Sequence, residues 1–497
     1  MNVADSEVVA AIMQTTDCEL TDDIAQADIV ILNTCSIRDN AEQKVQHRLQ
    51  ELRSENGKRK AENNKRIIGV IGCMAERMGE ALINEHGVSF VVGPDAYLDI
   101  PNLLAQCELG HKAINIELST TETYREVMPA RIGKQISGFV SIMRGCNNFC
   151  SYCIVPYTRG RERSRDIDSI LNEVRDLQEK GYKEVTLLGQ NVNSYKYVQT
   201  YEDGSEKIIG FAQLLEMVAL AVPSMRIRFT TSHPKDMSDE TLEVIAAHDN
   251  LCKFIHLPVQ SGSNRILKLM NRKYTREDYL DKIKKLKEKV PGISITTDII
   301  VAFPGETEEQ FQDTLKLVET IEFEGAYTFI YSPRIGTPAA TYPNPLTEDE
   351  KKQRLLTLNK HINDGYYKGN KRFEGMVVKV LVDGVSSKNN EILTGYTEHN
   401  KVGYIPIDAL YSPIERVSYE VDNARVGQDA NYDKLIMNVQ TNGSIRPEEA
   451  MALSARILIE HFNIVTDLNA ISDVSGLMAE KKVDTITKTL ETPIEEI

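Results

Sequence analysis

Short apolar runs alternate with helix-like stretches through most of residues 1–365, and this alternation restricts the chain to a small set of folds. Parallel strands need a long crossover connection, usually a helix, so a repeated strand–helix pattern predicts parallel sheets of the α/β class. In residues 1–125 the apolar runs lie at 27–33, 66–72 and 88–93. We therefore expect a small, flavodoxin-like parallel α/β domain in this part of the chain.

The alternation continues with longer units through residues 130–368. Parallel strands separated by amphipathic helices predict an open, partial (βα)6 barrel, with functional residues on the loops that follow the strands. The six apolar runs lie at 138–144, 184–190, 226–231, 253–259, 294–303 and 326–332.

The pattern changes after residue 370. Residues 373–401 are typical of two or three antiparallel strands of a small β domain, and we expect an α+β segment over residues 402–463. Within that segment, residues 444–462 begin with a Ser and a nearby Pro and then carry an apolar helical face. Residues 464–497 are polar and acidic, so we expect a flexible tail there.

The composition is that of a globular protein, with 497 residues, 41% hydrophobic and 26% charged. The sequence shows no apolar run of about 18 residues and no secretory signal pattern, so we expect a cytoplasmic protein without membrane contact. The net charge of −15 argues against a broad nucleic-acid-binding surface. A local basic patch would still attract phosphate, so charge alone does not decide the substrate.

Three cysteines, Cys146, Cys150 and Cys153, stand close together directly after the first apolar run of the second block. In a reducing compartment such a cluster indicates metal or redox chemistry more often than disulfides. A zinc site needs a fourth ligand, and residues 135–165 contain no histidine, while Cys107 is the nearest other cysteine. A 4Fe–4S cluster held by three thiolates fits better, because its free iron can bind S-adenosylmethionine.

Two further cysteines, Cys35 and Cys73, each follow an apolar run of the first block. Open α/β sheets bind ligands at the carboxyl ends of their strands, so the two could share a ligand. A lone cysteine is otherwise a small buried hydrophobe, which is our interpretation of Cys18, Cys107 and Cys252.

The three-cysteine motif, with the aromatic Tyr152 just before its last cysteine, resembles the defining motif of the radical-SAM superfamily. Further stretches resemble the radical-SAM methylthiotransferase family, and most closely its MiaB branch. The stretch "GQNVNSY" favours this branch over relatives that act on threonylcarbamoyl-adenosine in tRNA or on a ribosomal protein aspartate. The matching stretches are 1–7, 33–44, 72–77, 92–97, 144–165, 187–195, 256–275 and 296–307.

This resemblance implies a tRNA methylthiotransferase that adds a methylthio group at C2 of N6-isopentenyladenosine next to the anticodon. The C2–H bond is unactivated, so the reaction needs a radical. The resemblance implies S-adenosylmethionine, two 4Fe–4S clusters and a flavodoxin-type electron donor as its sources. One molecule of S-adenosylmethionine would supply the methyl group and a second the radical. The partner would be tRNA, read in an unstacked anticodon loop, and the protein would be a monomer.

The resemblance also assigns roles to individual residues. Cys146, Cys150 and Cys153 would hold the catalytic cluster, and Cys35 and Cys73 would be ligands of the second. Arg161, Arg163 and Arg165 would neutralise phosphate or carboxylate charge near the cluster, although a solvated basic loop is the alternative for each. Residues implied at the cofactor or substrate are Tyr152, Arg163, Gly189, Gln190, Asn191, His256, Gln260, Ser261, Phe303 and Pro304.

The sequence departs from the family pattern at both ends. The third ligand of the second cluster normally stands just before the position of Met1, so we expect either an internal start codon or an incomplete second cluster. Residues 373–401 match only the first part of the family's TRAM domain, and residues 402–497 instead resemble part of the bacterial RNA polymerase α subunit. We expect a chimeric reading frame with an unpaired sheet edge and an exposed apolar helix. From this segment alone, an RNA polymerase assembly module is the alternative function.

Overall fold

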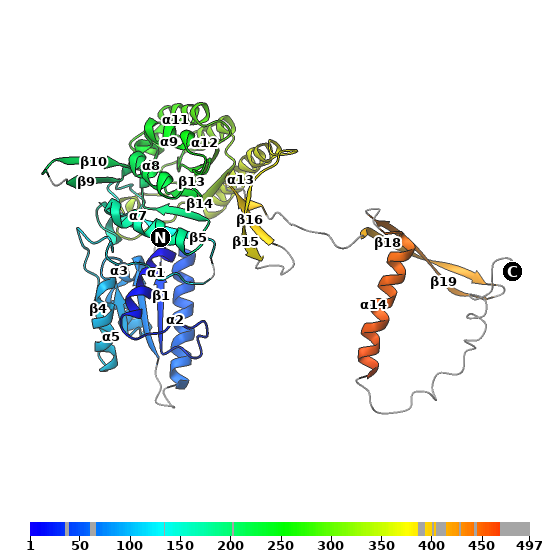
Figure 1. Ribbon diagram of the computed structural model, residues 1–497. Coiled ribbons are helices and arrows are strands. Elements are labelled where there is room, and N and C mark those ends of the chain that lie inside the picture. Colours follow the sequence, from blue (N-terminus) through cyan, green and yellow to red (C-terminus); the bar gives the residue numbers. More distant parts are fainter. Residues whose placement is uncertain are drawn as a thin grey trace. The chain divides into compact units, whose positions relative to one another are not determined.

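The computed structural model describes residues 1–34, 39–59, 66–133, 135–200, 203–385, 393–399, 402–403, 414–426, 429–441 and 445–467. The chain divides into two compact units, Met1–Ile405 and Pro406–Ile497, which are described separately below (Figure 1). None of the helices in the described ranges is long and apolar enough to cross a membrane.

The first unit begins with a four-stranded parallel sheet in the order β1-β2-β3-β4. Strands stand at the three expected apolar runs, and the short β4 was not expected from the sequence. The flavodoxin order, in which the first strand lies between the second and third, is not found among these strands. The strands are β1 (Ile29–Thr34), β2 (Ile67–Gly72), β3 (Phe90–Val92) and β4 (Ala113–Asn115).

Helices cover both faces of this sheet, because successive strand residues such as Val70 and Ile71 point to opposite sides. Ile71 packs with residues of α1 and α5, whereas Val70 packs with residues of α2, α3 and α4. The sheet is thereby buried on both sides, as expected for parallel strands. The helices are α1 (Asn2–Gln14), α2 (Asp39–Arg59), α3 (Cys73–Met78), α4 (Glu80–His86) and α5 (Ile100–Glu108).

The second part of this unit carries six parallel strands at the six predicted runs, but they form two three-stranded sheets. The sheets are ordered β11-β8-β5 and β12-β13-β14, and between β11 and the residues before β12 there is only a parallel bridge from Ile227 to Leu251. The barrel is therefore open and interrupted midway. The strands are β5 (Ser137–Ser141), β8 (Glu184–Leu188), β11 (Arg226–Thr230), β12 (Phe254–His256), β13 (Ser294–Val301) and β14 (Gly325–Ile330).

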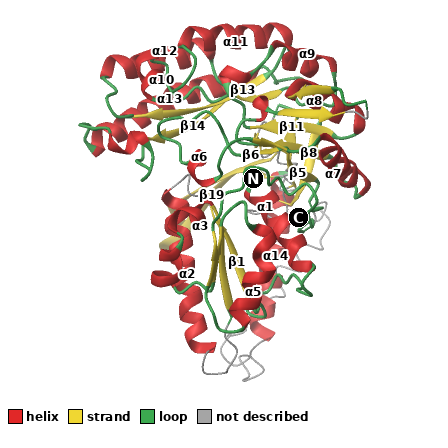
Figure 2. Ribbon diagram, turned by 90° about the vertical axis from the view of Figure 1, so that its left-hand side faces the viewer, coloured by secondary structure: helices red, strands yellow, loops and turns green. Residues whose placement is uncertain are grey.

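Helices pack on the outer face of these strands, as Figure 2 shows. Their apolar residues form one continuous core with the outward-facing strand residues, for example Ile170 and Val174 of α7 with Val140 and Val185. These helices are α7 (Ile167–Glu179), α8 (Phe211–Ala221), α9 (Asp239–Ala247), α10 (Asn264–Leu269), α11 (Arg276–Lys289), α12 (Glu308–Ile321) and α13 (Glu348–Lys371). The short α6 (Val155–Thr158) directly follows Cys153 and contacts α3 instead.

Three small antiparallel sheets complete the unit, and the first two were not predicted. One pairs β6 (Met143–Arg144) with β7 (Arg163–Ser164), and another is the hairpin of β9 (Lys196–Thr200) and β10 (Glu206–Gly210). The third has the order β15-β16-β17, which agrees with the antiparallel strands expected in this region. Its strands are β15 (Val380–Val385), β16 (Leu393–Thr397) and β17 (Val402–Gly403).

Two arginines of β11 attach this last sheet to the barrel. Arg226 donates a hydrogen bond from Nη1 to the carbonyl oxygen of Tyr396 at 2.8 Å. Arg228 donates from Nη2 to the carbonyl of Thr397 at 2.6 Å and from Nη1 to that of Glu398 at 3.2 Å. The small sheet is thus fixed to the barrel wall through its main chain.

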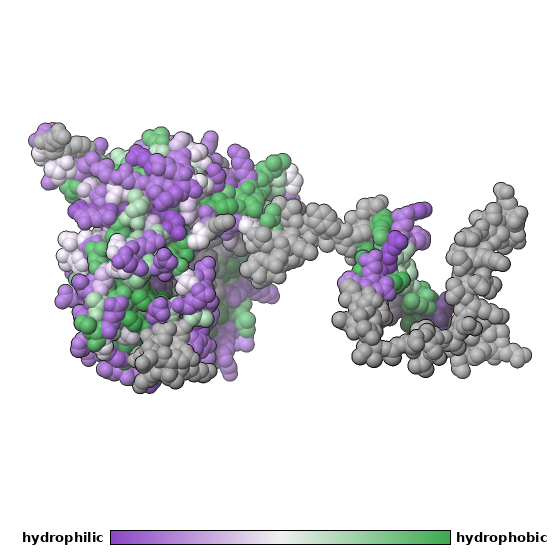
Figure 3. All heavy atoms as spheres, turned by 60° about the horizontal axis from the view of Figure 1, so that its bottom comes forward, coloured by the Kyte–Doolittle hydropathy of each residue, from purple (hydrophilic) through white to green (hydrophobic). Residues whose placement is uncertain are grey.

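In its described residues, the second unit has a long antiparallel hairpin and one helix. The hairpin pairs β18 (Ile414–Val426) with β19 (Asp429–Thr441), and α14 (Pro447–Asp467) covers most of the predicted helix at 444–462. Apolar side chains are exposed on both, including Tyr419 at 73% and Phe462 at 65%, and hydrophobic residues lie on the surface of this unit in Figure 3. The expected exposure of the apolar helix face is therefore observed.

Candidate active site

The three-cysteine loop is enclosed by the β6–β7 pair at the carboxyl end of β5. Cys146 donates its backbone N–H to the carbonyl of Gly160 at 3.2 Å, which closes the loop. Gly145 makes this closure possible, because its φ is +74° and a Cβ there would lie 2.1 Å from the carbonyl oxygen of Arg161. The side chain of Ser151 donates to the carbonyl of Leu269 at 2.8 Å, which fixes the loop to α10.

The three thiols of the loop are shielded from solvent to different degrees. Cys150 is buried and Cys146 and Cys153 are half-buried. Burial, together with the neighbouring Cys150, raises the pKa of the Cys153 thiol to about 12, and burial also raises the pKa of Cys146. Thiols in this setting become thiolates only beside positive charge, which bound iron supplies.

Nitrogen donors are already directed at two of these sulfurs. Arg272 donates from Nη1 to Sγ of Cys150 at 3.5 Å, and the backbone N–H of Asn148 donates to Sγ of Cys146 at 3.5 Å. Among the described residues, no three His, Cys, Asp or Glu side chains converge closely enough for a single metal ion. A cluster binds each thiolate at a different iron atom, so the donor set and its N–H···S contacts fit a 4Fe–4S group.

A cavity of about 1150 Å³ opens beside this loop on the inner side of the strands. Of the predicted site residues, Tyr152, Cys153, His256 and Gln260 line it. Sequence reasoning missed most of its wall, because inward-facing strand residues carry no motif. The missed lining residues include Phe139, Glu184, Arg228, Phe254, Asp298, Tyr327, Phe329, Arg334 and Tyr396.

Polar side chains of neighbouring strands pair across this cavity wall. The His256 ring nitrogen Nδ1 lies 3.0 Å from Oγ1 of Thr296, and its Nε2 lies 3.3 Å from Oδ1 of Asp298. Gln260 adopts a φ of +71° and its backbone pairs with Asp298 and Ile300, which turns the chain at the cavity edge. His256 and Gln260 therefore lie at the cavity, and a contact of either residue with the cofactor stays a prediction.

The predicted residues after β8 are not among those that line the cavity. Gly189 allows close packing, because a Cβ there would lie 2.5 Å from Cγ of Met143. Asn191 donates from Nδ2 to Asp236 at 2.7 Å. The side-chain oxygen of Gln190 is buried and has no hydrogen-bond partner in the described part of the chain. A buried, unpaired oxygen of this kind is consistent with contact to a polar ligand.

Ser261, Phe303 and Pro304 do not line the cavity either. Ser261 is buried and its Oγ lies 3.4 Å from Oγ1 of Thr314 in α12. Phe303 is fully buried and packs edge-on against the ring of Tyr152, with the centroids 6.4 Å apart. These contacts support the position of Tyr152; any direct contact of the three residues with a cofactor stays a prediction.

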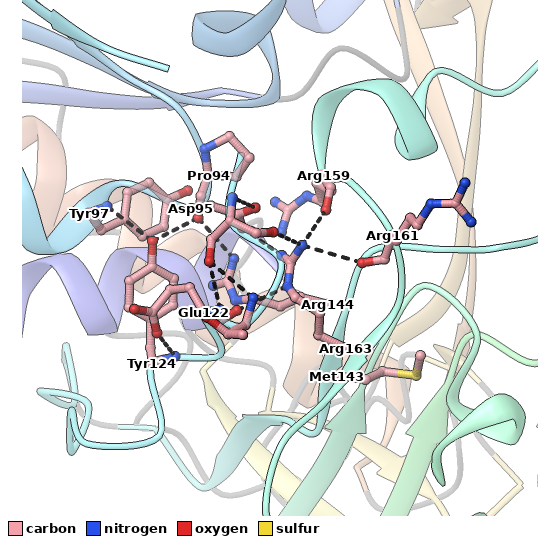
Figure 4. Close-up of polar contacts among 12 residues, drawn as sticks. Pro94, Asp95, Tyr97, Glu122, Tyr124, Met143, Arg144, Arg159, Arg161 and Arg163 are labelled. Carbon is pink, nitrogen blue, oxygen red and sulfur yellow. Dashed lines mark hydrogen bonds and ion pairs between the residues drawn. The ribbon is translucent and has the colours of Figure 1, made fainter. Parts of the chain in front are cut away.

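The predicted basic residues have different surroundings (Figure 4). Arg163 is buried and donates from Nη2 to Asp95 at 2.7 Å and from Nη1 to the carbonyl of Ser119 at 2.6 Å. Arg165 pairs with the buried Glu173. Arg161 is exposed and lies over the ring of Phe149, 5.8 Å from its centroid. Arg163 and Arg165 thus make structural ion pairs, which the sequence did not predict, and a contact with ligand charge stays a prediction for all three.

A second group of buried arginines joins α1, beside the four-stranded parallel sheet, to the cysteine loop. Arg144 and Arg159 both pair with the carboxylate of Asp5 in α1. Arg159 also donates from Nε to Sγ of Cys73 at 3.1 Å. Cys73 follows Gly72, the register partner of Thr34, so it lies at the sheet edge as predicted. Cys35 lies outside the described residues.

Comparison with known proteins places these features in a family. The Radical SAM superfamily model matches residues 140–318, and the model of the Uncharacterized protein family UPF0004 matches residues 1–93. A solved structure of the radical S-adenosylmethionine methyltransferase TsrM from Kitasatospora setae shares the fold, with a TM-score of 0.51 and 15% identity over 68% of this chain and 72% of that one.

Curated relatives are far more similar in sequence. The proteins of Parabacteroides distasonis and Bacteroides thetaiotaomicron are each 57% identical over 404 residues, which cover 81% of this chain and 86% and 87% of theirs. Both bear the name tRNA-2-methylthio-N(6)-dimethylallyladenosine synthase. The chain therefore belongs to this family of radical-SAM tRNA methylthiotransferases.

Proposed function

We propose that this protein adds a methylthio group at C2 of N6-dimethylallyladenosine, the same nucleoside as N6-isopentenyladenosine, beside the anticodon of tRNA. The names of its relatives support this substrate. The observation that carries the chemistry is the three-cysteine loop, whose Cys153 lies in the wall of a cavity of about 1150 Å³. Mass spectrometry of tRNA nucleosides from a deletion strain, with and without the gene restored, tests the substrate. Continued methylthiolation of N6-dimethylallyladenosine in the deletion strain would contradict it, and loss of a different modification would support a relative's substrate instead.

In this proposal Cys146, Cys150 and Cys153 hold a 4Fe–4S cluster. When bound, the cluster and S-adenosylmethionine supply the radical chemistry that breaks the C2–H bond. Arg272 donates an N–H to Sγ of Cys150 and so helps to fix the position of this sulfur. Iron and acid-labile sulfide counts after anaerobic reconstitution test the assignment, with Cys252→Ala as the matched control because Cys252 is a buried cysteine outside the loop. Equal iron in Cys150→Ala and in this control would contradict it.

We further propose Cys73, with Cys35, as ligands of a second 4Fe–4S cluster. Support comes from the buried position of Cys73 at the sheet edge, close to Arg159. Spectra of the Cys150→Ala protein after reconstitution isolate any iron held at this second position. Loss of that iron signal in a Cys73→Ala, Cys150→Ala double variant is the expected result.

The remaining assignments follow from the resemblance. We propose tRNA and a flavodoxin-type protein as partners, a cytoplasmic location and a monomeric state. The proposed domains are a second-cluster domain at 1–125, a radical-SAM core at 130–368, a partial TRAM domain at 373–401, an RNA polymerase α-like segment at 402–463 and a flexible tail at 464–497. Sequencing genomic DNA upstream of the first codon and across codons 398–405 tests whether the two ends of the reading frame are genuine.

A further inference from the structure

The three-cysteine loop is flanked by two buried arginines that reach towards the four-stranded parallel sheet. Arg144 stands two residues before Cys146, and Arg159 stands six residues after Cys153. Arg159 directly follows α6, and α6 contacts α3, whose first residue is Cys73. The segment that carries the three loop cysteines therefore also brings a guanidinium group to Cys73.

The three nitrogens of the Arg159 guanidinium have different surroundings. Its Nε donates to Sγ of Cys73 at 3.1 Å, and its Nη2 donates to Oδ2 of Asp5 at 2.7 Å. Its Nη1 is buried and has no hydrogen-bond partner in the described part of the chain. Buried donors are nearly always satisfied, so an unpaired N–H next to a sulfur atom indicates an acceptor that binds there.

The ion pairs of Arg144 and Arg159 leave positive charge uncompensated. These side chains belong to residues that are only 2% and 4% exposed, and they share the single carboxylate of Asp5 (Figure 4 shows the two arginines). Glu76, a half-buried carboxyl of α3, makes no ion pair with either arginine, and burial together with Asp95 raises its pKa to about 7. Buried charge is normally paired, so this excess favours an anion beside Arg159.

A thiolate that holds an iron–sulfur cluster is an anion of the required kind. Its sulfur and the sulfurs of the cluster accept N–H···S hydrogen bonds, which tune the potential of the cluster. Arg159 offers two N–H groups from one planar fork, Nε towards Cys73 and the unpaired Nη1 beside it. The residues present therefore fit a cluster bound at Cys73.

We propose that Arg159 is a positioning residue for the second cluster, whose charge and N–H groups hold the Cys73 thiolate and a neighbouring sulfur and make the cluster easier to reduce. This inference rests on the second cluster proposed above. A reduced cluster carries one more negative charge than an oxidised one, so a guanidinium group in contact with it raises the reduction potential. Asp5 holds Arg159 in place from the other side.

The test measures the reduction potential of the second cluster rather than turnover. The parent protein is Cys150→Ala after anaerobic reconstitution, which isolates iron held at the second position, and a redox titration is followed by electron paramagnetic resonance. Adding Arg159→Gln should lower the potential by about 59 mV, which is about a tenfold change in a one-electron equilibrium. Adding Arg159→Lys keeps the positive charge and should retain most of the potential.

Arg77→Gln is the matched control in the same parent protein. Arg77 is a half-buried arginine of α3, the helix that begins with Cys73, but its Nη2 pairs with Glu42 at 2.6 Å. Its replacement should leave the potential unchanged. An unchanged potential in Arg159→Gln overturns the inference, and so does an equal shift in Arg77→Gln, because the effect would then reflect overall charge. In both cases iron bound by the parent protein leaves the second cluster standing.

Iron content keeps the test decisive if Arg159→Gln binds too little iron for a titration. With folding confirmed by circular dichroism, iron restored in Arg159→Lys supports the inference, because the cluster then depends on the charge. Iron lost in both variants overturns it, since the shape of the side chain would then matter instead. If the Cys150→Ala parent binds no iron, the second cluster and this inference fail together, whereas the tRNA nucleosides still decide the substrate.

Discussion

Replacing Asp5 with Asn removes the one negative charge that two buried arginines share. Asp5 is fully buried in α1, and Arg144 and Arg159 approach it from the two sides of the cysteine loop. Burial opposes ionisation, but the two guanidinium groups outweigh it and lower the pKa of Asp5 from 3.8 to about 2. This shift corresponds to roughly 2.4 kcal/mol of stability at neutral pH, from about 1.36 kcal/mol per pKa unit.

A second estimate of the stability lost in Asp5→Asn is of similar size. Breaking a buried ion pair by removing one partner costs about 3–5 kcal/mol, because an uncompensated charge remains in the interior. Asn keeps an oxygen that still accepts a hydrogen bond from one arginine, so we expect Asp5→Asn to cost the smaller value, about 2.4 kcal/mol. The folded-state pKa is lowered, so this stability is fully present above about pH 4 and is lost as the pH falls towards 2.

The assay is urea denaturation followed by far-UV circular dichroism, since the chain contains no tryptophan for fluorescence. Asp22→Asn is the matched control, because Asp22 is an exposed aspartate of the same domain. The difference in free energy of unfolding between Asp5→Asn and wild type should be large at pH 7 and smaller at pH 3. A cost below about 0.5 kcal/mol at pH 7, the range of ordinary surface substitutions, would refute the reasoning.

Three other substitutions have defined outcomes. Gly145→Ala places a Cβ 2.1 Å from a loop carbonyl oxygen and should lower the iron bound after reconstitution several-fold. Gly181 has a similar positive φ and nothing within 4 Å of its would-be Cβ, so Gly181→Ala should not lower it. Equal iron in the two variants would contradict this prediction. Burial raises the pKa of Glu306 from 4.5 to about 7, so the folded state holds this proton more tightly and stability should fall as the pH rises from about 4.5 to 7. Glu306→Gln should flatten that slope in denaturation midpoints, and an unchanged slope would rule out Glu306 as its source. Arg228→Met should speed amide exchange in residues 393–399, measured by mass spectrometry, and unchanged protection would show that Arg228 does not hold this sheet.

The strand positions of the barrel were predictable from the sequence, because buried parallel strands leave continuous apolar runs. The residues at which the strands end were less predictable. The run 253–259 predicted a long strand, but β12 ends at His256. Beyond it the backbone N–H of Val259 bonds to the side chain of Thr297, and Gln260 takes a positive φ. Side-chain hydrogen bonds across strands have no periodicity that a sequence reveals.

The cysteine loop was also recognisable in the sequence, because the spacing of its three cysteines is a local feature. The ion pairs around it were not. Arg163 bonds to Asp95, 68 positions away, and Arg159 bonds to Asp5, 154 positions away, so nothing in the local sequence distinguishes these arginines from a solvated basic loop. Phe139 was missed for the same reason, since an inward-facing phenylalanine on a strand looks like any core residue until the cavity is seen.

The attachment of the small sheet has a consequence for how freely this region can diverge. Towards the small sheet, Arg226 and Arg228 donate to main-chain oxygens, including those of Tyr396, Thr397 and Glu398. Every amino acid supplies such an oxygen, so substitutions at these three positions preserve the docking bonds as long as β16 keeps its register. At these positions the barrel therefore constrains the path of the neighbouring backbone rather than the identity of its side chains.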